Sequence, residues 1–323
     1  MSGVRTADEV VLALTCSDIH LSHKAPAARS VEECWYRAQR RPLGQLATLR
    51  DEITDKQGFA PVVVYAGDVF DRPNPPPQLV NFALDHLPQG YAVPGQHDLL
   101  HHSLKDIKKS AFWTLVKARK LTYLAPGRPV ECGEPGRRVR LHGFPWGKPL
   151  KPCRDPNALL VEVAVVHAYW WLDYTTKHPQ AEESTHLTAS RRQKLLGGYD
   201  AVVIGDNHTS WWKDDFVLNH GCFIRRKLDE REHRPLIGLV CERKGKVTVR
   251  RHHLDTEADC FADPKDVTEE APDFGDFLAE LSSLTDAPVN FTEAVRALLS
   301  KGELGERARD YILRAMGDET EPR

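Results

Sequence analysis

Five short apolar runs, spread over the first two thirds of the chain, each end in a loop that contains Asp, His or a side-chain amide. The runs lie at residues 10–16, 61–67, 91–95, 161–166 and 201–205. An uninterrupted apolar run of this length predicts a strand that is buried on both faces. Helical patterns lie between several of the runs. The alternation predicts an α/β layered domain with helices outside the sheets.

The helical patterns cover residues 31–57, 78–87, 108–120 and 186–196, and we expect the first to be interrupted near Pro42 and Gly44. Residues 139–144 and 216–254 read as further strands, the latter with a hairpin turn at 243–246. Beyond about residue 254, acidic and turn residues dominate, and two short amphipathic helical segments follow at 277–284 and 292–316. We therefore expect a domain over residues 1–260 and a small, acidic, mainly helical tail over 261–323.

Composition excludes several classes of protein. Of the 323 residues, 28% are charged and 41% hydrophobic, which excludes global disorder. No apolar run approaches the roughly 18 residues that a membrane helix needs, so no membrane partner is expected. The first ten residues do not resemble a secretion signal. The seven cysteines are odd in number and form no C-x-x-C pair, which argues against a disulfide framework and fits a cytoplasmic location.

The polar loops bring metal-binding side chains to the ends of the predicted strands. In layered α/β folds, bound molecules lie in a crevice at the carboxyl ends of the strands, so we expect these side chains to converge there. Three Asp, three His and one Gln suit two divalent ions, with Mn²⁺, Fe²⁺, Zn²⁺ or Mg²⁺ favoured over thiophilic metals. Two ions ~3.5–4 Å apart clamp a phosphoryl group and activate water at neutral pH. The candidate ligands are Asp18, His20, Asp68, Gln96, His167, Asp206 and His208.

The spacing of the first pair carries its own prediction. Asp18 and His20 are two residues apart directly after the first apolar run. If the extended strand direction continues, alternate side chains point to the same side. Both side chains would then reach one ion.

The order of these loops, D-x-H, G-D-x-x-D, G-Q-H-D, a strand-end His and G-D-N-H, is similar to the motif series of calcineurin-like metallophosphoesterases. The resemblance covers about residues 10–250 and implies a two-sheet sandwich flanked by helices. It also implies two ligand groups joined by a bridging carboxylate: Asp18, His20 and His208 for one ion, Asp68 as the bridge, and Gln96, His167 and Asp206 for the second.

The same resemblance implies catalytic roles for two residues that bind no metal. His97 would protonate the leaving oxygen or stabilise the transition state, and Asp98 would orient it. Two ligands depart from the usual pattern, because Gln96 stands in place of Asn and Asp206 in place of His. The longer amide arm and the anionic oxygen predict a harder second site that favours Mn²⁺ over Zn²⁺.

Residues 219–226, with the sequence NHGCFIRR, resemble the N-P-G-S-x-x-R segment of SbcD-type DNA repair exonucleases, with His220 and Cys222 replacing the Pro and Ser. This branch implies DNA as substrate and an SMC-like ATPase subunit as partner, contacted by the tail. A homodimer is a further expectation. Arg225 and Arg226 are candidate phosphate contacts, whereas His220 either contacts substrate or packs inside the protein.

Two other functions remain open. The metal site equally suits a phosphatase or phosphodiesterase acting on nucleotides or phosphoproteins. The departures at Gln96 and Asp206 also fit a scaffold subunit of a DNA-processing ATPase with a degraded second metal site. The pairs Trp170-Trp171 and Trp211-Trp212 follow metal motifs and either stack on nucleobases or pack under a loop.

The net charge of −2 is the sum of two opposed parts. Residues 254–323 hold 18 Asp and Glu against 7 Lys and Arg, a net charge of −11. Residues 1–253 hold 28 acidic and 37 basic residues, a net charge of +9. The predicted catalytic body is therefore basic enough to attract a polyanion.

Overall fold

The computed structural model describes residues 9–157, 159–179, 181–265 and 267. The strands form two six-stranded mixed sheets, so the predicted two-sheet α/β architecture is confirmed. The strands are β1 (Val10–Cys16), β2 (Val62–Ala66), β3 (Gly90–Val93), β4 (Leu121–Tyr123), β5 (Val130–Glu134), β6 (Arg137–Phe144), β7 (Val161–His167), β8 (Ala201–Gly205), β9 (Trp211–Lys213), β10 (Val217–Asn219), β11 (Leu236–Arg243) and β12 (Lys246–His253).

One sheet has the strand order β12-β11-β1-β2-β3-β4, and the other β5-β6-β7-β8-β10-β9. Within the first, β1 to β4 run parallel, and within the second, β6, β7, β8 and β10 run parallel. Parallel strands end at a common edge. The loops that follow β1, β2, β3, β7 and β8 therefore meet at one end of the sandwich.

Alternating side chains explain why the strand runs are apolar throughout. In β1, Leu14 and Cys16 face the helices, whereas Ala13 faces the opposing sheet. In β7, Val165 lies between the sheets, and Val166 packs on the outer face with Trp170 and Leu187. Each strand thus contributes to two cores, which is the physical reason for an unbroken apolar run.

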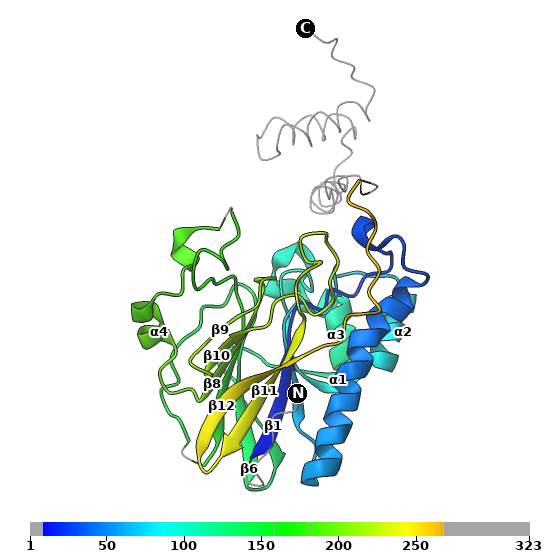
Figure 1. Ribbon diagram of the computed structural model, residues 1–323. Coiled ribbons are helices and arrows are strands. Elements are labelled where there is room, and N and C mark those ends of the chain that lie inside the picture. The colour runs from blue at the N-terminus through cyan, green and yellow to red at the C-terminus, as the bar shows by residue number, and fades with distance from the viewer. Residues whose placement is uncertain (1–8, 158, 180, 266, 268–323) are drawn as a thin grey trace, which may run out of the picture. The chain divides into compact units, whose positions relative to one another are not determined.

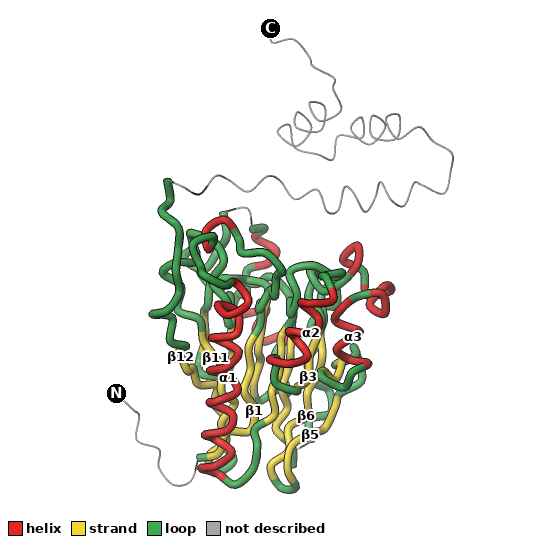
Figure 2. The backbone as a smooth tube through the Cα atoms, turned by 90° about the vertical axis from the view of Figure 1, so that its right-hand side faces the viewer, coloured by secondary structure: helices red, strands yellow, loops and turns green. Residues whose placement is uncertain are grey.

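Helices cover both outer faces. The helices α1 (Trp35–Gln57), α2 (Pro77–His86) and α3 (Ala111–Lys117) lie against the first sheet (Figure 2). Helix α4 (Ala189–Leu195) lies on the far side of the second sheet (Figure 1). Short 3-10 helices are found at Ala27–Arg29, Leu100–His102, Leu104–Lys109 and Glu183–Thr185.

Helix α1 contradicts the predicted interruption, because it continues through Pro42 and Gly44. Leu43, Leu46 and Ile53 on one face of the helix are at most 1% exposed. Burying three such side chains is worth several kcal/mol, roughly 1.5–3 each, which offsets the ~3 kcal/mol cost of an interior proline.

Residues 220–235 form a loop between β10 and β11, whereas the sequence pattern predicts strand throughout 216–254. The hairpin at 243–246 is confirmed. The predicted helix at 108–120 is split, because Ser110 ends one 3-10 turn and caps α3 through a hydrogen bond from the backbone N–H of Trp113.

The predicted tail helices lie outside the described residues, and the boundary at residue 260 stays a prediction. Residues up to Ala262 pack on the body, since the backbone N–H of Ala262 donates to the carbonyl of Ala28. No described helix is both long and apolar enough to cross a bilayer.

Candidate metal centre and active site

The seven predicted ligands converge from both sheets. Their loops are joined by hydrogen bonds that cross from one sheet to the other. Nδ1 of His167, at the end of β7, donates to the carbonyl of Ala66 in β2 at 2.7 Å. The backbone N–H of Asp206, after β8, donates to both carboxylate oxygens of Asp18 at 3.1 Å. The site thus lies where the ends of the two sheets meet.

Four of the seven residues adopt backbone conformations that L-residues rarely take. Their φ angles are positive: 52° at Asp18, 49° at His20, 52° at Asp68 and 95° at Asp206. Such conformations cost of order 1 kcal/mol or more each and cluster at functional sites. The strand direction therefore does not continue through the D-x-H motif, and Asp18 and His20 approach each other through a turned backbone.

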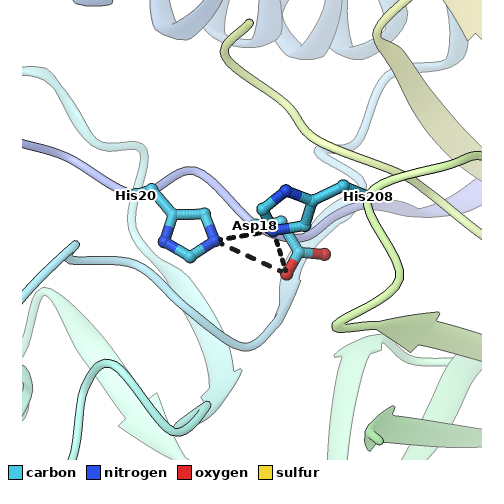
Figure 3. Close-up of side chains that lie close together, drawn as sticks. All are labelled: Asp18, His20 and His208. Carbon is cyan, nitrogen blue, oxygen red and sulfur yellow. Dashed lines mark hydrogen bonds and ion pairs between the residues drawn. The ribbon is translucent and has the colours of Figure 1, made fainter. Parts of the chain in front are cut away.

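Asp18, His20 and His208 form the first ligand group (Figure 3). Nε2 of His20 lies 3.1 Å from Nε2 of His208 and 3.9 Å from a carboxylate oxygen of Asp18. Nδ1 of His208 is 3.0 Å from the carboxylate of Glu230. An ionised carboxylate only accepts, so Nδ1 carries the proton and the lone pair of Nε2 faces the group.

His167 and Gln96 centre the second group. Because the carbonyl of Ala66 only accepts, Nδ1 of His167 is the protonated nitrogen. Its Nε2 faces the amide oxygen of Gln96 at 2.8 Å and the carboxylate of Asp68 at 3.3 Å. The Gln96 amide nitrogen donates to Asp206 at 2.9 Å. Asp68 lies between the groups, since the same carboxylate oxygen that faces His167 is also 3.6 Å from Nε2 of His20.

The donor set fits two divalent cations. Lone pairs from imidazoles, carboxylates and an amide point at one another, an arrangement that a cation between them stabilises. Buried atoms without a hydrogen-bond partner among the described residues include Nδ1 of His20 and one carboxylate oxygen each of Asp68 and Asp206. A buried, unpaired anionic oxygen is costly unless it binds a cation.

Burial also perturbs the acidities. It raises the pKa of Asp18 to about 6 against the opposing charges of His167 and His208. It lowers the pKa of His20 well below the usual range, and the positive charge of Arg226 adds to this effect. Both pKa shifts show that water solvates these side chains poorly. This is expected at a site where the charge of a metal ion takes the place of solvent.

Two glycines let the backbone approach the ligands. A Cβ at Gly95 would lie 2.0 Å from a carboxylate oxygen of Asp68 and 2.5 Å from Nε2 of His167. At Gly67, where φ is +101°, it would lie 2.0 Å from Nδ1 of His167. No larger residue fits at either position without displacing a ligand.

His97 lies beside the first ligand group, with its ring centroid 4.9 Å from that of His20. Its Nδ1 is 3.1 Å from the backbone carbonyl of Asp71, and its backbone N–H donates to Asp68 at 3.0 Å. The expected orienting contact from Asp98 to this ring is not formed. The Asp98 carboxylate instead accepts from the backbone N–H groups of Val69, Phe70 and Gly95 at 2.9–3.2 Å.

Asp98 therefore ties the loop after β2 to the loop after β3. Its side chain is fully buried, and burial, with a smaller contribution from the charge of Asp68, raises its pKa to about 7. The cause of the difference from prediction is geometric. The Asp98 carboxylate lies beneath two turns, where three backbone N–H groups are within hydrogen-bond distance. These donors occupy its oxygens, so it does not contact the neighbouring imidazole.

Of the three candidate substrate contacts, the structure places only Arg226 at the site. Arg226 lies at the site and forms an ion pair with Asp71 at 2.5 Å. Arg225 points away from it and pairs with Asp259 at 2.9 Å, so it joins the loop to residues 254–262. His220 is 1% exposed and lies inside the protein, with Nε2 2.7 Å from the hydroxyl of Thr15 and Nδ1 2.9 Å from the carbonyl of Ile204. The packing alternative for His220 is the one observed.

Two residues at the site carry no assignment from the sequence. Glu230 holds His208 and lies 22 positions further along the chain, with no motif around it. Asp71 closes the G-D-x-x-D motif, and its carboxylate lies 3.8 Å from Nδ1 of His20. The motif itself is the available signal for Asp71, whereas no local pattern marks Glu230.

Comparison with solved structures finds similar chains at low identity. A calcineurin-like phosphoesterase, YfkN from Bacillus subtilis, is 11% identical, with a TM-score of 0.44 over 86% of this chain and 98% of its own. The sulfate thiohydrolase SoxB from Thermus thermophilus is 11% identical, with a TM-score of 0.46 over 90% and 63%. The phosphopantetheinyl hydrolase PptH from Mycobacterium tuberculosis is 13% identical, with a TM-score of 0.35 over 70% and 94%.

A search of curated protein sequences found no significant match. The family model described as calcineurin-like phosphoesterase matches residues 13–222, which span all seven converging ligands. The ordered strand-end loops, their arrangement at one end of two sheets and this match agree: the chain belongs to the calcineurin-like phosphoesterase family and is a metal-dependent phosphoesterase.

Proposed function

We propose that the protein hydrolyses phosphodiester bonds in DNA, in the manner of SbcD-type nucleases, with Mn²⁺ as its preferred metal. The observation that carries the DNA assignment is the charge of the catalytic body. Residues 1–253, which contain the whole site, have a net charge of +9. A basic body attracts an extended polyanion more strongly than it attracts a small phosphate ester, because many phosphates contribute at once.

The residues of the site suit cleavage of a diester. Two divalent ions, when bound, would neutralise a phosphoryl group and lower the pKa of water. Asp68 lies between the two ligand groups and orders both. Nδ1 of His97 donates to the carbonyl of Asp71, so Nε2 carries a proton only when the ring is an imidazolium cation, and in that form it can protonate the departing sugar oxygen. Arg226 adds positive charge beside Asp71, with which it forms an ion pair.

The metal preference rests on the second ligand group. Gln96 and Asp206 offer oxygen atoms where nitrogen or a shorter amide is usual in the family. Oxygen ligands shift a mixed site towards harder cations such as Mn²⁺. Activity of the metal-free protein after reloading with Mn²⁺ or with Zn²⁺ would test this preference, and higher activity with Zn²⁺ would contradict it.

The test of activity is release of nucleotides from linear duplex DNA in the presence of Mn²⁺. We expect release by the wild type that weakens steeply with added salt, and none by Asp68→Asn. No release by the wild type, or full release by Asp68→Asn, would rule the proposal out. Efficient hydrolysis of small esters with no salt dependence would favour the phosphatase alternative on nucleotides or phosphoproteins.

One observation favours a second candidate, the scaffold subunit. The side-chain N–H of Gln96 is engaged by another second-site ligand, because it donates to the carboxylate of Asp206 at 2.9 Å. A second group bonded to itself in this way binds its ion less tightly. Metal analysis of the purified protein separates the candidates: two ions per chain with turnover supports the nuclease, whereas one ion without turnover supports the scaffold.

The partner proposed for this protein is an SMC-like ATPase subunit. The support is the acidic character of residues 254–323, with a net charge of −11, opposite to that of the body. Copurification of the full chain with such a subunit should be lost when residues 268–323 are removed. Equal recovery of the subunit with the shortened chain would contradict a role for the tail.

A further inference from the structure

The four tryptophans next to the metal motifs do not form a stacking surface. Trp170, Trp171 and Trp211 are at most 6% exposed, and Trp170 and Trp211 pack in the outer core of the second sheet. Trp212 is 44% exposed but lies on the edge strand β9 under the guanidinium of Arg251, 4.0 Å from the ring centroid. Packing therefore accounts for three of the four.

A different aromatic side chain is presented to solvent in the loop that follows β7. Tyr174 is 78% exposed. Its ring centroid lies 5.6 Å from that of Trp171, which in turn stacks on His186 at 3.9 Å with an interplanar angle of 8°. The ammonium group of Lys177 lies 5.0 Å from the Trp171 ring and 5.8 Å from the Tyr174 ring.

The loop after β7, which carries Trp171 and Tyr174, is hydrogen-bonded to the loop after β8, which carries Asp206 and His208. Asn207, between the ligands Asp206 and His208, donates from its side-chain amide to the carbonyl of Trp170 at 2.9 Å and to that of Thr176 at 2.8 Å. Asn207 is 3% exposed, so these bonds are shielded from water. The position of Tyr174 is thereby set relative to the second ligand group.

Further hydrogen bonds fix the loop around Thr176 and at residues 184–187. The hydroxyl of Thr176 accepts from the backbone N–H groups of Leu172 and Asp173 at 3.0 and 3.1 Å. The guanidinium groups of Arg191 and Arg192 in α4 donate to backbone carbonyls at residues 184, 186 and 187. Lys177 forms an ion pair with Glu183 at 2.5 Å. A loop that is fixed in this way loses little entropy when a ligand stacks on it.

We propose that Tyr174, supported by Trp171 and Lys177, is a stacking platform for the terminal nucleobases of a DNA strand whose phosphodiester lies in the metal site. The proposal rests on the proposed DNA substrate. An exposed aromatic ring accepts any base, since every base has a π-face. Residues 189–195 (ASRRQKL) add three cations, which offset the three acids Asp173, Glu182 and Glu183 of the loop itself.

The test compares binding of two single-stranded oligonucleotides, one with bases throughout and one with abasic residues at the two terminal positions of each end. Binding is measured by fluorescence anisotropy with Ca²⁺ in place of Mn²⁺, so that DNA is not consumed. We expect wild type to prefer the fully base-bearing strand by roughly 5- to 150-fold, the equivalent of about 1–3 kcal/mol per stacked base.

The Tyr174→Ala variant should lose this preference, whereas Tyr174→Phe should keep it, because the ring and not the hydroxyl makes the stack. Trp212→Ala, a matched change of an exposed aromatic elsewhere on the second sheet, should also keep it. The platform is ruled out if Tyr174→Ala retains the wild-type preference, if Tyr174→Phe loses it, or if the wild type shows none. Failure of the wild type to release nucleotides is a separate result that overturns the nuclease proposal alone.

Discussion

The carboxylate of Glu230 accepts a hydrogen bond from Nδ1 of His208 at 3.0 Å. Its second oxygen accepts from the backbone N–H groups of Arg226 and Lys227 at 2.6 and 3.0 Å. Burial by itself raises the pKa of Glu230, but the bond to His208 and these donors outweigh burial and lower it to about 2. One buried carboxylate thus orients a metal ligand and holds the loop that carries Arg226.

Replacing Glu230 should weaken metal binding without unfolding the protein. In Glu230→Gln, the neutral amide is a weaker acceptor, so the His208 ring loses its fixed tautomer and orientation. We expect Mn²⁺ affinity to fall roughly 10- to 100-fold, as measured by titration calorimetry. Glu52→Gln, at a carboxylate that is 55% exposed on α1, serves as control. Equal affinities for the two variants would show that Glu230 has no orienting role.

Substituting Gly95 should disrupt the site through a single methyl group. In Gly95→Ala, the new Cβ would overlap Asp68 and His167, so both ligands have to move. We expect phosphoesterase activity to fall at least 100-fold, since misplacement by about 1 Å has that effect. Activity towards bis-p-nitrophenyl phosphate measures the loss, and wild-type activity would contradict it.

Gly44→Ala is the matched glycine substitution. Gly44 lies in helix α1 and is exposed, and a Cβ added there would meet no atom within 4 Å. Alanine has the higher helix propensity, so the free energy of unfolding should rise by about 0.5–1 kcal/mol with activity unchanged. Urea denaturation of both glycine variants and the wild type gives the comparison, and a loss of stability in Gly44→Ala would show hidden strain in this helix.

Loss of His97 should depend on the leaving group. DNA hydrolysis expels a poorly acidic sugar alcohol that needs a proton, so we expect His97→Ala to lower its rate roughly 10²- to 10⁴-fold. p-Nitrophenolate leaves readily without one, and hydrolysis of bis-p-nitrophenyl phosphate should fall far less. Steady-state rates on both substrates test this. Equal losses would assign His97 to positioning rather than to proton transfer.

His220 should make the fold sensitive to acid. Burial lowers its pKa to about 4 from an ordinary 6.5, so the unfolded chain binds a proton more readily than the native state. Stability is therefore full above pH 6.5 and declines as the pH falls towards 4. At pH 5 the loss should be about 2 kcal/mol relative to pH 7.5.

Urea denaturation in EDTA at the two pH values measures this loss. EDTA removes the contribution of metal binding, which itself depends on pH. The His220→Gln variant cannot be protonated, so its loss between pH 7.5 and pH 5 should be smaller than that of wild type by the same amount. An identical pH dependence for the two proteins would place the acid sensitivity elsewhere.

The ligand set could be predicted from sequence because its geometry follows from topology. Asp18, Asp68 and His167 each follow a continuous apolar run, and parallel strands end at one edge of a sheet. Only the order of the runs and the residues after them are needed to predict that such side chains meet. The backbone turns at Asp18 and His20 could not be predicted, because they depend on hydrogen bonds to the neighbouring loop after β2.

Contacts between distant segments decided the rest. Pro42 stays inside a helix because a sheet face buries its neighbours, and Asp98 binds backbone amides because two turns cover it. His220 lies between Thr15 and Ile204, and Glu230 reaches His208, through folding of a loop that the strand pattern did not reveal. The sequence by itself indicated the layers and the candidate metal ligands, since both follow from apolar periodicity and from the order of the runs along the chain. Only the tertiary structure decided which polar group pairs with which, because partners are chosen by proximity in space.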